Sequence, residues 1–302
     1  MKVAVLRDIS EKEIAQIRAF GVDVVKDNDY SADIIFCRDR VENVGKYKNL
    51  KWIHGSFVGV DKFLTDEIKR SDILITNSKG AYNSTVSEHA LALMLAINRG
   101  LNIAIPAQQK KEWTKFEEAD ELYGKKVGIV GSGDIGSSIA RLCKAFGCKT
   151  FGMSRSNKKP RPIDILVPKS RLHDLLKESD YVVVSLPLTP ETKHLIGKKE
   201  FTAMKKTSVL INIGRGQVID EKELVKALKN GKIAGAGLDV FEEEPLSVSS
   251  ELWSMKNVII TAHYAGYTPQ LNSRLMDIFC TNLREFLKTG KLSNAIDKKK
   301  GY

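Results

Sequence analysis

The fold of this chain is decided by the stretch Lys126-Val127-Gly128-Ile129-Val130-Gly131-Ser132-Gly133-Asp134-Ile135-Gly136. A short apolar strand leads directly into the pattern GxGxxG, and a helical segment follows. A glycine turn between a strand and a helix is typical of a dinucleotide-binding unit. Gly131 would form the tight turn, Gly133 would let the backbone approach a pyrophosphate, and Gly136 would let the helix pack against the strand.

Asp134 and Ile135 open the helix behind this turn. The unpaired N–H groups and the dipole of a helix N-terminus favour a phosphate. We therefore expect both residues to bind the cofactor together with the three glycines. The alternative is a glycine-rich turn without a ligand.

The rest of the chain alternates short β-branched runs with helical segments, which is typical of parallel sheets covered by helices. One such series fills the first third of the chain, where a long helix is expected over Ser84–Gly100, and a second runs from Lys125 to Thr261. The expected strands are Val3–Leu6, Asp33–Phe36, Trp52–Ile53, Ile73–Thr76, Lys126–Val130, Lys149–Met153, Tyr181–Ser185, Ser208–Asn212, Gly235–Asp239 and Val258–Thr261. A long helix is expected after Pro269. The sequence therefore predicts an α/β protein with two doubly wound parallel-sheet domains.

The composition is that of a folded, water-soluble chain, with 302 residues, 42% hydrophobic and 28% charged. The longest apolar stretch, Leu91–Ile97, is far shorter than the roughly 20 residues that span a membrane. Residues 1–6 resemble a first strand and lack the apolar core of a secretion signal. The four cysteines form no CxxC pair and no disulfide framework. These features predict a cytoplasmic protein that has no membrane partner and no metal.

The formal net charge of +11 is concentrated between Lys144 and Arg171, where eight basic residues face Asp164 alone. Such a run is most often a solvated surface, and nucleic-acid binding is the usual alternative. This run, however, surrounds the end of the second strand of the dinucleotide unit. We therefore interpret its centre as a pocket for one phosphate, with its outer lysines solvated, and expect no nucleic-acid partner.

The second strand of the unit, Lys149–Met153, ends in Ser154-Arg155-Ser156-Asn157-Lys158-Lys159. A carboxylate normally holds the adenosine ribose hydroxyls at this place, and it would repel a 2′-phosphate. Ser154, Arg155 and Ser156 can instead bind that phosphate through their hydroxyls and guanidinium. The sequence therefore predicts NADP(H) as the preferred cofactor, with NAD(H) possible.

Three polar residues, Arg215, Glu244 and His263, follow three successive strands of the second series, where open α/β sheets place their ligands. Hydride transfer between a nicotinamide and a 2-oxo acid needs a proton donor and a cation for the carboxylate. His263 suits the first task, because imidazole titrates near neutral pH, with Glu244 holding its ring. Arg215 suits the second.

Each of these residues also has an ordinary explanation when it is taken alone. His263 could be a buried histidine, the acidic run could be a solvated turn, and Arg215 could pair with Asp220 or Glu221. Their joint arrangement behind a dinucleotide unit favours the catalytic interpretation.

With these stretches in view, the chain resembles the D-isomer-specific 2-hydroxyacid dehydrogenases over nearly its whole length. The resemblance rests on GSGDIG at 131–136, LPLTPET at Leu186–Thr192, NIGRGQVID at Asn212–Asp220, GLDVFEEEPL at Gly237–Leu246 and the segment around His263. It implies a Rossmann-type cofactor domain, residues 99–269, inserted in a flavodoxin-like substrate domain, residues 1–98 plus 270–302. It also implies a homodimer formed mainly through the cofactor domain.

The resemblance further implies roles for individual residues. Arg215, Glu244 and His263 would be catalytic, and the backbone N–H groups of Val58 and Gly59 would bind the substrate carboxylate. The cofactor would be contacted by Asp239 at the carboxamide and by Pro187 and Thr192 along the adenosine.

The chain departs from the family pattern at three positions. Ser154 replaces the ribose-binding acid, and Ala262 replaces the proline that usually precedes the catalytic histidine, which loosens a restraint on φ. Phe57 stands before Val58, where its ring would either narrow the substrate pocket or pack beneath it.

The substrate is predicted from resemblance alone. Arg38 and Arg40 lie where phosphoglycerate dehydrogenases carry substrate-binding arginines, but the cofactor site is more similar to NADP-linked glyoxylate and hydroxypyruvate reductases. We expect reduction of glyoxylate or hydroxypyruvate to the D-2-hydroxy acid. A phosphoglycerate dehydrogenase-like enzyme and a nucleotide-sensing corepressor-like protein are the alternatives.

Overall fold

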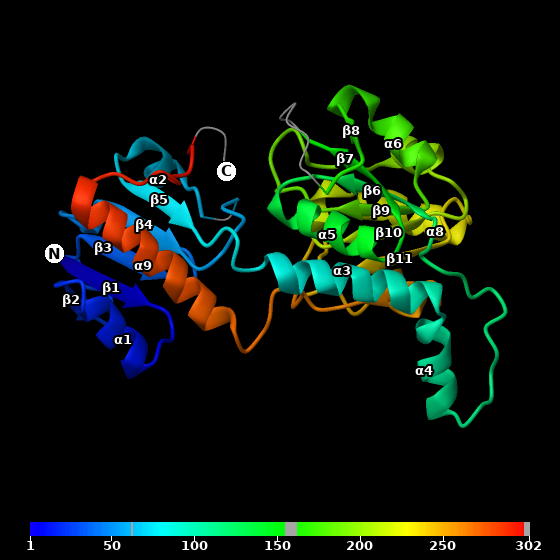
Figure 1. Cartoon of the computed structure of the whole chain (residues 1–302), viewed down its shortest axis with the longest axis horizontal. Coiled ribbons are helices and arrows are strands. Elements are labelled where there is room, and N and C mark those ends of the chain that lie inside the picture. The colour runs from blue at the N-terminus through cyan, green and yellow to red at the C-terminus, as the bar shows by residue number, and fades with distance from the viewer. Residues whose placement is uncertain (62, 155–161, 299–302) are drawn as a thin grey trace. The chain divides into compact units, whose positions relative to one another are not determined.

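The computed structural model describes residues 1–61, 63–154 and 162–298 (Figure 1). Contacts divide the chain into two compact units. The first unit is Met1–Tyr82 with Thr268–Tyr302, and the second unit is Asn83–Tyr267. The chain thus leaves the first unit once and returns to it with its last helix.

The first unit is built on a five-stranded parallel sheet in the order β2-β1-β3-β4-β5. Its strands are β1 Lys2–Leu6, β2 Asp23–Val25, β3 Ile34–Cys37, β4 Trp52–Gly55 and β5 Leu74–Asn77. Its helices are α1 Glu11–Arg18, α2 Asp66–Arg70, α9 Leu271–Thr289 and the 3₁₀ turn η1 Val44–Lys46. The strand order 2-1-3-4-5 is that of flavodoxin-like folds, as expected.

The last helix, α9, belongs to the core of the first unit. Its apolar face packs with the first strands, and Phe279 stacks on Phe36 with ring centroids 4.3 Å apart. Burial of this face explains why residues so far along the chain return to the N-terminal sheet.

The second unit is built on a seven-stranded parallel sheet in the order β12-β11-β10-β9-β6-β7-β8. Its strands are β6 Lys126–Val130, β7 Lys149–Met153, β8 Ile165–Val167, β9 Tyr181–Val184, β10 Val209–Asn212, β11 Gly235–Leu238 and β12 Val258–Ile260. Numbered within the unit, this order is 3-2-1-4-5-6-7, the Rossmann arrangement with one further strand. The order reverses between β6 and β9, which is where such sheets bind ligands.

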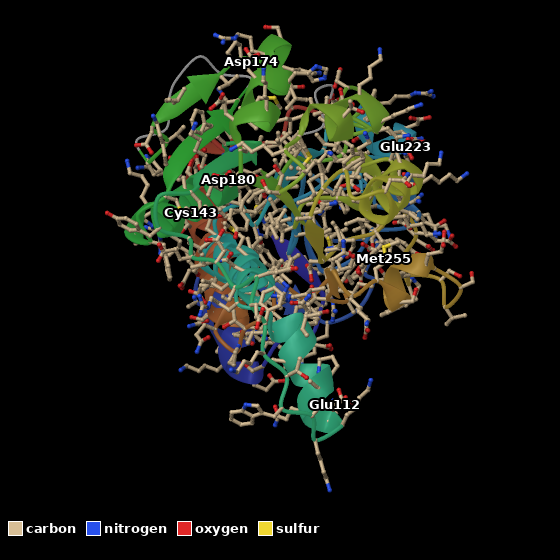
Figure 2. The ribbon with its side chains drawn as sticks, turned by 90° about the vertical axis from the view of Figure 1, so that its right-hand side faces the viewer. Glu112, Cys143, Asp174, Asp180, Glu223 and Met255 are labelled. Atoms are coloured by element: carbon tan, nitrogen blue, oxygen red, sulfur yellow. The ribbon has the colours of Figure 1, made fainter. Side chains whose placement is uncertain are left out.

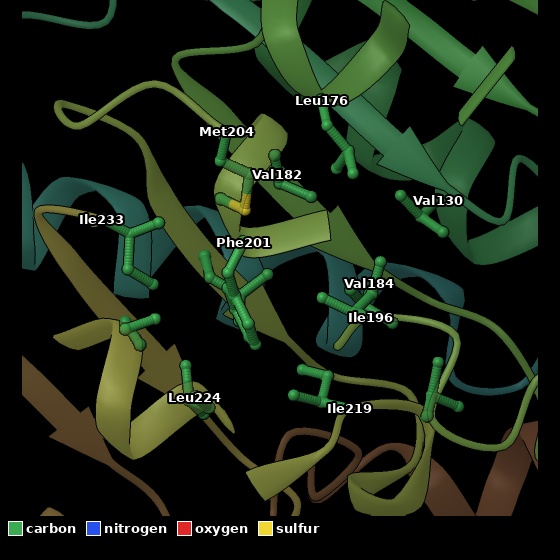
Figure 3. Packing of buried hydrophobic residues seen from close by; sticks show 14 of the residues in the cluster. Val130, Leu176, Val182, Val184, Ile196, Phe201, Met204, Ile219, Leu224 and Ile233 are labelled. Atoms are coloured by element: carbon green, nitrogen blue, oxygen red, sulfur yellow. The ribbon is translucent and has the colours of Figure 1, made fainter. Parts of the chain in front are cut away.

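Helices cover both faces of this sheet. They are α3 Asn83–Asn98, α4 Leu101–Gln109, α5 Asp134–Ala145, α6 Leu172–Glu178, α7 Lys198–Ala203 and α8 Glu221–Lys229, with 3₁₀ turns η2 Lys169–Arg171, η3 Gly216–Val218 and η4 Glu251–Ser254. Figure 3 shows the apolar core in which Leu176, Phe201 and Leu224 pack against strand residues such as Val182. Figure 2 shows α4 extending away from the sheet, with Glu112 just beyond its end.

The boundary between the compact units lies at Tyr82/Asn83, whereas the sequence suggested a boundary after residue 98. The reason is the packing of α3, which contacts α5 and β11 of the second unit. A second difference is α4, because one helix was expected to end at Gly100. That residue does break the helix, with φ of +67°, but a new helix begins at once.

The edge strands β2 and β8 were not expected either. Each has only three residues, too few for an alternating pattern to show.

Among the described residues no single helix is long and apolar enough to cross a membrane. The helices α3 and α4 pass that test only as a pair, which is bent by 70°.

Candidate active site

The glycine turn after β6 has the shape that a pyrophosphate requires. Gly131 has a φ of +108°, and a Cβ on Gly136 would lie 2.2 Å from the carbonyl oxygen of Gly131, so neither position accepts a side chain. Among the described residues, no atom lies within 4 Å of a Cβ placed on Gly133, so the space beside it is open. Within the same part of the chain, no side chain caps the start of α5. Its first N–H groups and this open space fit a dinucleotide phosphate.

The end of β7 is tied to the glycine turn. The backbone N–H groups of Gly131 and Ser132 donate to the carbonyl oxygen of Met153 at 3.2 and 2.9 Å, which places Ser154 beside the turn. Arg155 and Ser156, the other predicted phosphate ligands, lie outside the described residues. Asp164, the acidic residue within the basic run, binds the start of β7. Its carboxylate accepts hydrogen bonds from the backbone N–H and the hydroxyl of Thr150.

Two residues in the outer part of the basic run form ion pairs within the protein. Lys144 forms an ion pair with Asp164 at 2.5 Å, and Arg171 pairs with Asp174 at 2.5 Å. These pairs are partly or largely exposed, so each contributes little to stability. Neither pair involves Ser154.

The loop after β9, which carries Pro187 and Thr192, is held closed by its own threonine. The Thr192 hydroxyl donates to the carbonyl oxygen of Pro187 at 2.7 Å and accepts from the N–H of Thr189 at 2.8 Å. Ser185 donates to the carbonyl oxygen of Gly131 at 2.6 Å. The loop therefore starts beside the glycine turn, at the edge where the strand order reverses.

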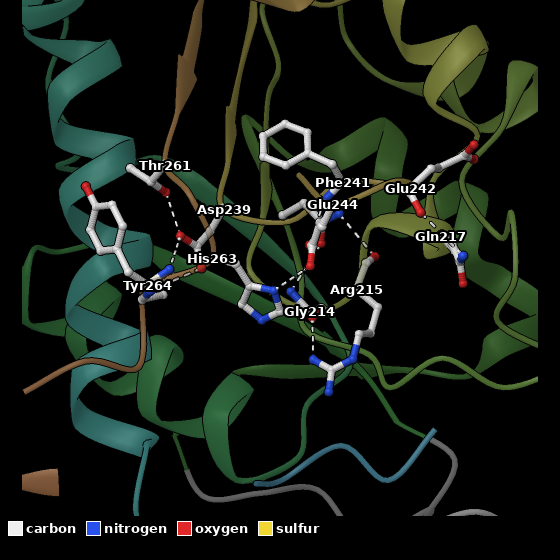
Figure 4. A network of polar contacts seen from close by, with 12 residues as sticks. Gly214, Arg215, Gln217, Asp239, Phe241, Glu242, Glu244, Thr261, His263 and Tyr264 are labelled. Atoms are coloured by element: carbon white, nitrogen blue, oxygen red, sulfur yellow. Dashed lines mark hydrogen bonds and ion pairs between the residues drawn. The ribbon is translucent and has the colours of Figure 1, made fainter. Parts of the chain in front are cut away.

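His263 and Glu244 form the pair that the sequence analysis expected. Figure 4 shows the ring of His263 directed toward Glu244, with Nδ1 2.8 Å from Oε2. Glu244 is oriented in turn, because its Oε1 accepts from the N–H of Phe241 at 3.1 Å. His263 has a φ of +52°, a left-handed conformation that histidine adopts more readily than most residues. The ring is half-exposed, and its bond through Nδ1 turns Nε2 away from Glu244.

Arg215 reaches the same edge of the sheet from β10. Its Nη1 donates to the carbonyl oxygen of Gly214 at 2.9 Å, and its own carbonyl oxygen accepts from Asn212 at 3.2 Å. The next residue, Gly216, packs directly on the backbone of Phe241, where a Cβ would lie 1.8 Å from the carbonyl carbon. The turn of Arg215 therefore lies against the turn of Glu244.

The carboxylates proposed as ordinary partners of Arg215 have other tasks. Asp220 caps α8 by accepting from the N–H of Glu223, and Glu221 accepts from the N–H of Glu242 at 3.1 Å. Burial raises the pKa of Glu221.

Asp239 is almost completely buried and anchors the loop that carries His263. Its Oδ1 accepts from the Thr261 hydroxyl at 2.7 Å and from the N–H of Tyr264 at 3.1 Å, and its Oδ2 accepts from the N–H of Ala265 at 3.1 Å. Its backbone carbonyl oxygen accepts from the N–H of His263 at 2.8 Å. No local sequence pattern marks this anchoring role, which only the fold makes visible. Its predicted contact with the cofactor stays a prediction.

In the first unit, Val58 and Gly59 follow β4 at the carboxyl edge of the sheet. Asn77, at the end of β5, donates to the carbonyl oxygen of Val58, and this bond fixes the loop. The ring of Phe57 fills the space above Gly55 and lies 5.0 Å from the ring of Phe63. The half-buried ring thus packs against the core of the first unit.

Three arginines follow strands at this edge of the first unit, and Arg40, like Arg38, is exposed. Arg38 is exposed and directly follows β3. Arg7, which the sequence analysis did not select, directly follows β1 and donates to the Ser56 hydroxyl at 2.8 Å and to the Asn272 side chain at 2.6 Å. Burial lowers the pKa of Arg7. Its position right after a parallel strand was the signal that could have identified it.

Comparison with known proteins decides the family. Residues 91–265 match the D-isomer specific 2-hydroxyacid dehydrogenase, NAD binding domain. The chain belongs to the D-isomer specific 2-hydroxyacid dehydrogenase family. It is an NAD(P)-dependent oxidoreductase of that family, and the predicted family and α/β fold are confirmed.

Several relatives of this dehydrogenase cover nearly its full length. The glyoxylate reductase of Thermococcus gammatolerans is 37% identical over 290 residues, covering 93% of this chain and 86% of the relative. A D-isomer specific 2-hydroxyacid dehydrogenase from Xanthobacter autotrophicus, solved with NADPH and MES, matches with a TM-score of 0.87 at 28% identity over 100% of this chain and 99% of the other. An NADPH-dependent glyoxylate/hydroxypyruvate reductase from Sinorhizobium meliloti, solved with NADP and sulfate, matches with a TM-score of 0.87 at 27% identity, with the same coverage.

The anchoring role of Asp239 in this dehydrogenase leads to a prediction. In Asp239→Asn, an NH₂ group replaces one of the two carboxylate oxygens that accept hydrogen bonds from the backbone N–H groups of the loop. Two donors then face each other at that position. We expect a loss of about 1–3 kcal/mol in the free energy of unfolding, together with a lower kcat, because the loop of His263 loosens. Urea denaturation and steady-state kinetics measure the two effects.

Asp220→Asn is the matched control, because Asp220 caps α8 and asparagine caps helices equally well. It should leave stability and kcat nearly unchanged. Equal effects of the two substitutions would contradict the anchoring role.

Proposed function

We propose that this dehydrogenase reduces a small 2-oxo acid, of the glyoxylate or hydroxypyruvate type, to its D-2-hydroxy acid with hydride from NADPH. The observation that carries the proposal is the bond between His263 Nδ1 and Glu244 Oε2 at 2.8 Å, at the same sheet edge as the glycine turn. The names of the relatives support the substrate class, since several are glyoxylate reductases.

His263 acts as the general acid in this proposal. With Nδ1 donating to Glu244, a protonated ring presents its second proton at Nε2, where it can pass to the carbonyl oxygen of the substrate. In the oxidative direction Nε2 takes the proton back. The carboxylate of Glu244 fixes the ring and stabilises its positive charge.

Arg215 binds the carboxylate of the acid, since its guanidinium stays charged and presents paired N–H donors. Val58, Gly59 and Arg38 are further candidates for binding the substrate, on the resemblance stated above. When bound, the cofactor supplies the hydride from its nicotinamide, and Gly131, Gly133 and Gly136 with the start of α5 hold its phosphates.

The preference for NADPH is supported by Ser154 at the end of β7, where a carboxylate would repel the 2′-phosphate. Two related structures were solved with NADPH or NADP. In Ser154→Asp, we expect the KM for NADPH to rise by about tenfold or more, while the KM for NADH changes little or falls.

Ser154→Asn is the control, because asparagine has the size of aspartate without its charge. It should retain most of the preference for NADPH. If the unmodified enzyme binds both cofactors equally well, the phosphate site is wrongly assigned.

The direct test of the function is an assay of several 2-oxo acids, each with NADPH and with NADH. Fastest turnover of glyoxylate or hydroxypyruvate with NADPH supports the proposal. Turnover of a phosphorylated three-carbon 2-oxo acid alone would support the phosphoglycerate dehydrogenase-like alternative. Cofactor binding without turnover of any acid would support the corepressor-like one.

The homodimer that the resemblance implies is also part of the proposal. Light scattering coupled to size-exclusion chromatography should give twice the chain mass of 33.6 kDa. A mass of one chain at micromolar concentration would contradict it.

A further inference from the structure

Two cysteines meet at the C-terminal end of α5. This end is a Schellman motif, in which Gly147 takes the left-handed conformation with φ of +77°. The N–H of Cys148 donates to the carbonyl oxygen of Cys143 at 3.0 Å, and the N–H of Gly147 donates to that of Lys144 at 3.0 Å. Cys143 and Cys148 therefore occupy the two positions whose side chains touch in this motif. Figure 2 labels Cys143 in α5.

The backbone geometry suits a disulfide between them. The hydrogen bond of 3.0 Å keeps the two Cα atoms within about 7 Å of each other. Natural disulfides join Cα atoms at about 4.4–6.8 Å. Because the two residues already occupy facing positions of the motif, no large backbone movement separates the reduced pair from the bonded one.

The two sulfurs are unequal in reactivity. The hydrogen bond from the Cys143 thiol lowers the pKa of Cys148, and the same bond together with burial raises the pKa of Cys143. The Cys148 thiol also donates to the carbonyl oxygen of Leu122 at 3.1 Å, and this bond breaks when Cys148 forms the thiolate, which is the nucleophile. Cys148 is 6% exposed, while Cys143 is 0% exposed.

The other two cysteines lack such a partner arrangement among the described contacts. Cys37 is buried in the first unit and donates to the carbonyl oxygen of His54, and burial raises its pKa to about 12. Burial also raises the pKa of Cys280 in α9. Both thiols are thus kept in the less reactive protonated form.

We propose that Cys143 and Cys148 form a reversible redox site that reacts with small hydroperoxides and closes as a disulfide. The Cys148 thiolate attacks one oxygen of the peroxide, the O–O bond breaks, and Cys148 becomes a sulfenic acid while hydroxide leaves. The Cys143 sulfur then attacks the Cys148 sulfur, the S–O bond breaks, and water leaves. With hydrogen peroxide, two thiols lose two electrons and two protons, and the peroxide becomes two waters.

The disulfide would link the last turn of α5 to the start of β7. It closes a short loop and so restricts the unfolded chain, which stabilises the folded second unit. A dithiol reductant reverses the step by thiol–disulfide exchange. The site lies at the opposite end of α5 from the glycine turn and is independent of the proposed function.

Peptide mapping tests the proposal on the unmodified protein. The chain is treated with a small excess of hydrogen peroxide, alkylated and cut with trypsin, which cleaves after Arg141, Lys144 and Lys149. We expect Leu142–Lys144 joined to Ala145–Lys149 through a disulfide, with the number of free thiols falling from four to two. Dithiothreitol should restore four thiols. The midpoint of thermal unfolding should rise by a few degrees on oxidation and return on reduction.

Variants provide the controls. Cys143→Ser and Cys148→Ser should each abolish the joined peptides and the thermal shift, whereas Cys280→Ser should retain both. Recovery of the two peptides unlinked after oxidation would overturn the proposal. So would a joined peptide that contains Cys37 or Cys280, or an irreversible sulfonic acid at Cys148 beside a free Cys143.

Discussion

Replacing His263 with asparagine should lower kcat by about 10²–10⁴-fold, while NADPH still binds. Asparagine tolerates the left-handed conformation of this position, with φ of +52°, so the loop can keep its shape. It cannot deliver a proton at the place where Nε2 lies. The loss therefore reports the missing proton transfer and not a distorted loop.

Steady-state kinetics with the best 2-oxo acid measures kcat, and quenching of protein fluorescence measures NADPH binding. His194→Asn is the matched control. His194 also has a φ of +52°, and its Nε2 lies 2.6 Å from Oε1 of Glu242, two residues before Glu244. It should change kcat by less than about threefold. Equal losses in the two variants, or a His263→Asn enzyme with more than a tenth of the original kcat, would reject the assigned role.

The second large effect concerns the stability of the first unit in acid. His54 lies in the centre of this unit, with Nδ1 2.7 Å from the Thr76 hydroxyl and Nε2 3.1 Å from the Ser78 hydroxyl. Ser78 donates to the carbonyl oxygen of Gly55, so it accepts from Nε2–H, and Nδ1 is the acceptor of a neutral ring. Burial, with a contribution from the charge of Arg7, lowers the pKa of His54 to about 3.

The unfolded chain binds a proton at this histidine near pH 6.5, whereas the folded chain does so only near pH 3. Between these values the unfolded state holds one more proton, so the free energy of unfolding falls as the pH falls. The slope approaches about 1.4 kcal/mol per pH unit, which amounts to about 2–3 kcal/mol between pH 6.5 and pH 4.5. Above pH 6.5 the histidine is neutral in both states, and it no longer lowers the free energy of unfolding.

Urea denaturation followed by tryptophan fluorescence measures this effect. Trp52 is fully buried two residues from His54, whereas Trp113 and Trp253 are exposed, so the emission change on unfolding reports mainly on the first unit. In His54→Gln, the slope of the free energy of unfolding against pH should fall by the equivalent of about one proton. This holds even if the substitution also changes the stability at neutral pH. His173→Gln removes an exposed ion pair with Glu200, which contributes little to stability, so it should change the slope far less than His54→Gln does. An unchanged slope in His54→Gln would show that His54 is not held neutral by the fold.

Much of the site could be predicted from local patterns in the sequence. Alternating apolar runs predicted ten of the strands close to their observed bounds, and the glycine turn marked the cofactor end of the second sheet. Because every strand of that sheet is parallel, residues just after the strands meet at one edge. Arg215, Glu244 and His263 could therefore be grouped without knowledge of the tertiary structure.

Other features followed from contacts that no local pattern records. The expected domain boundary after residue 98 differs from the division of the compact units, because α3 packs on α5 and β11 of the second unit. The strands β2 and β8 were missed because three residues show no periodicity.

By itself, the sequence determined the parallel α/β architecture, the family and the candidate catalytic residues, since periodicity and turn chemistry act over short stretches of chain. Only the tertiary structure decided how these residues are held. The anchoring of the His263 loop by Asp239 and the burial of a neutral His54 each depend on hydrogen bonds and burial set by three-dimensional packing. Such bonds join atoms whose distance is fixed by the fold, and no residue type or spacing specifies that distance in advance.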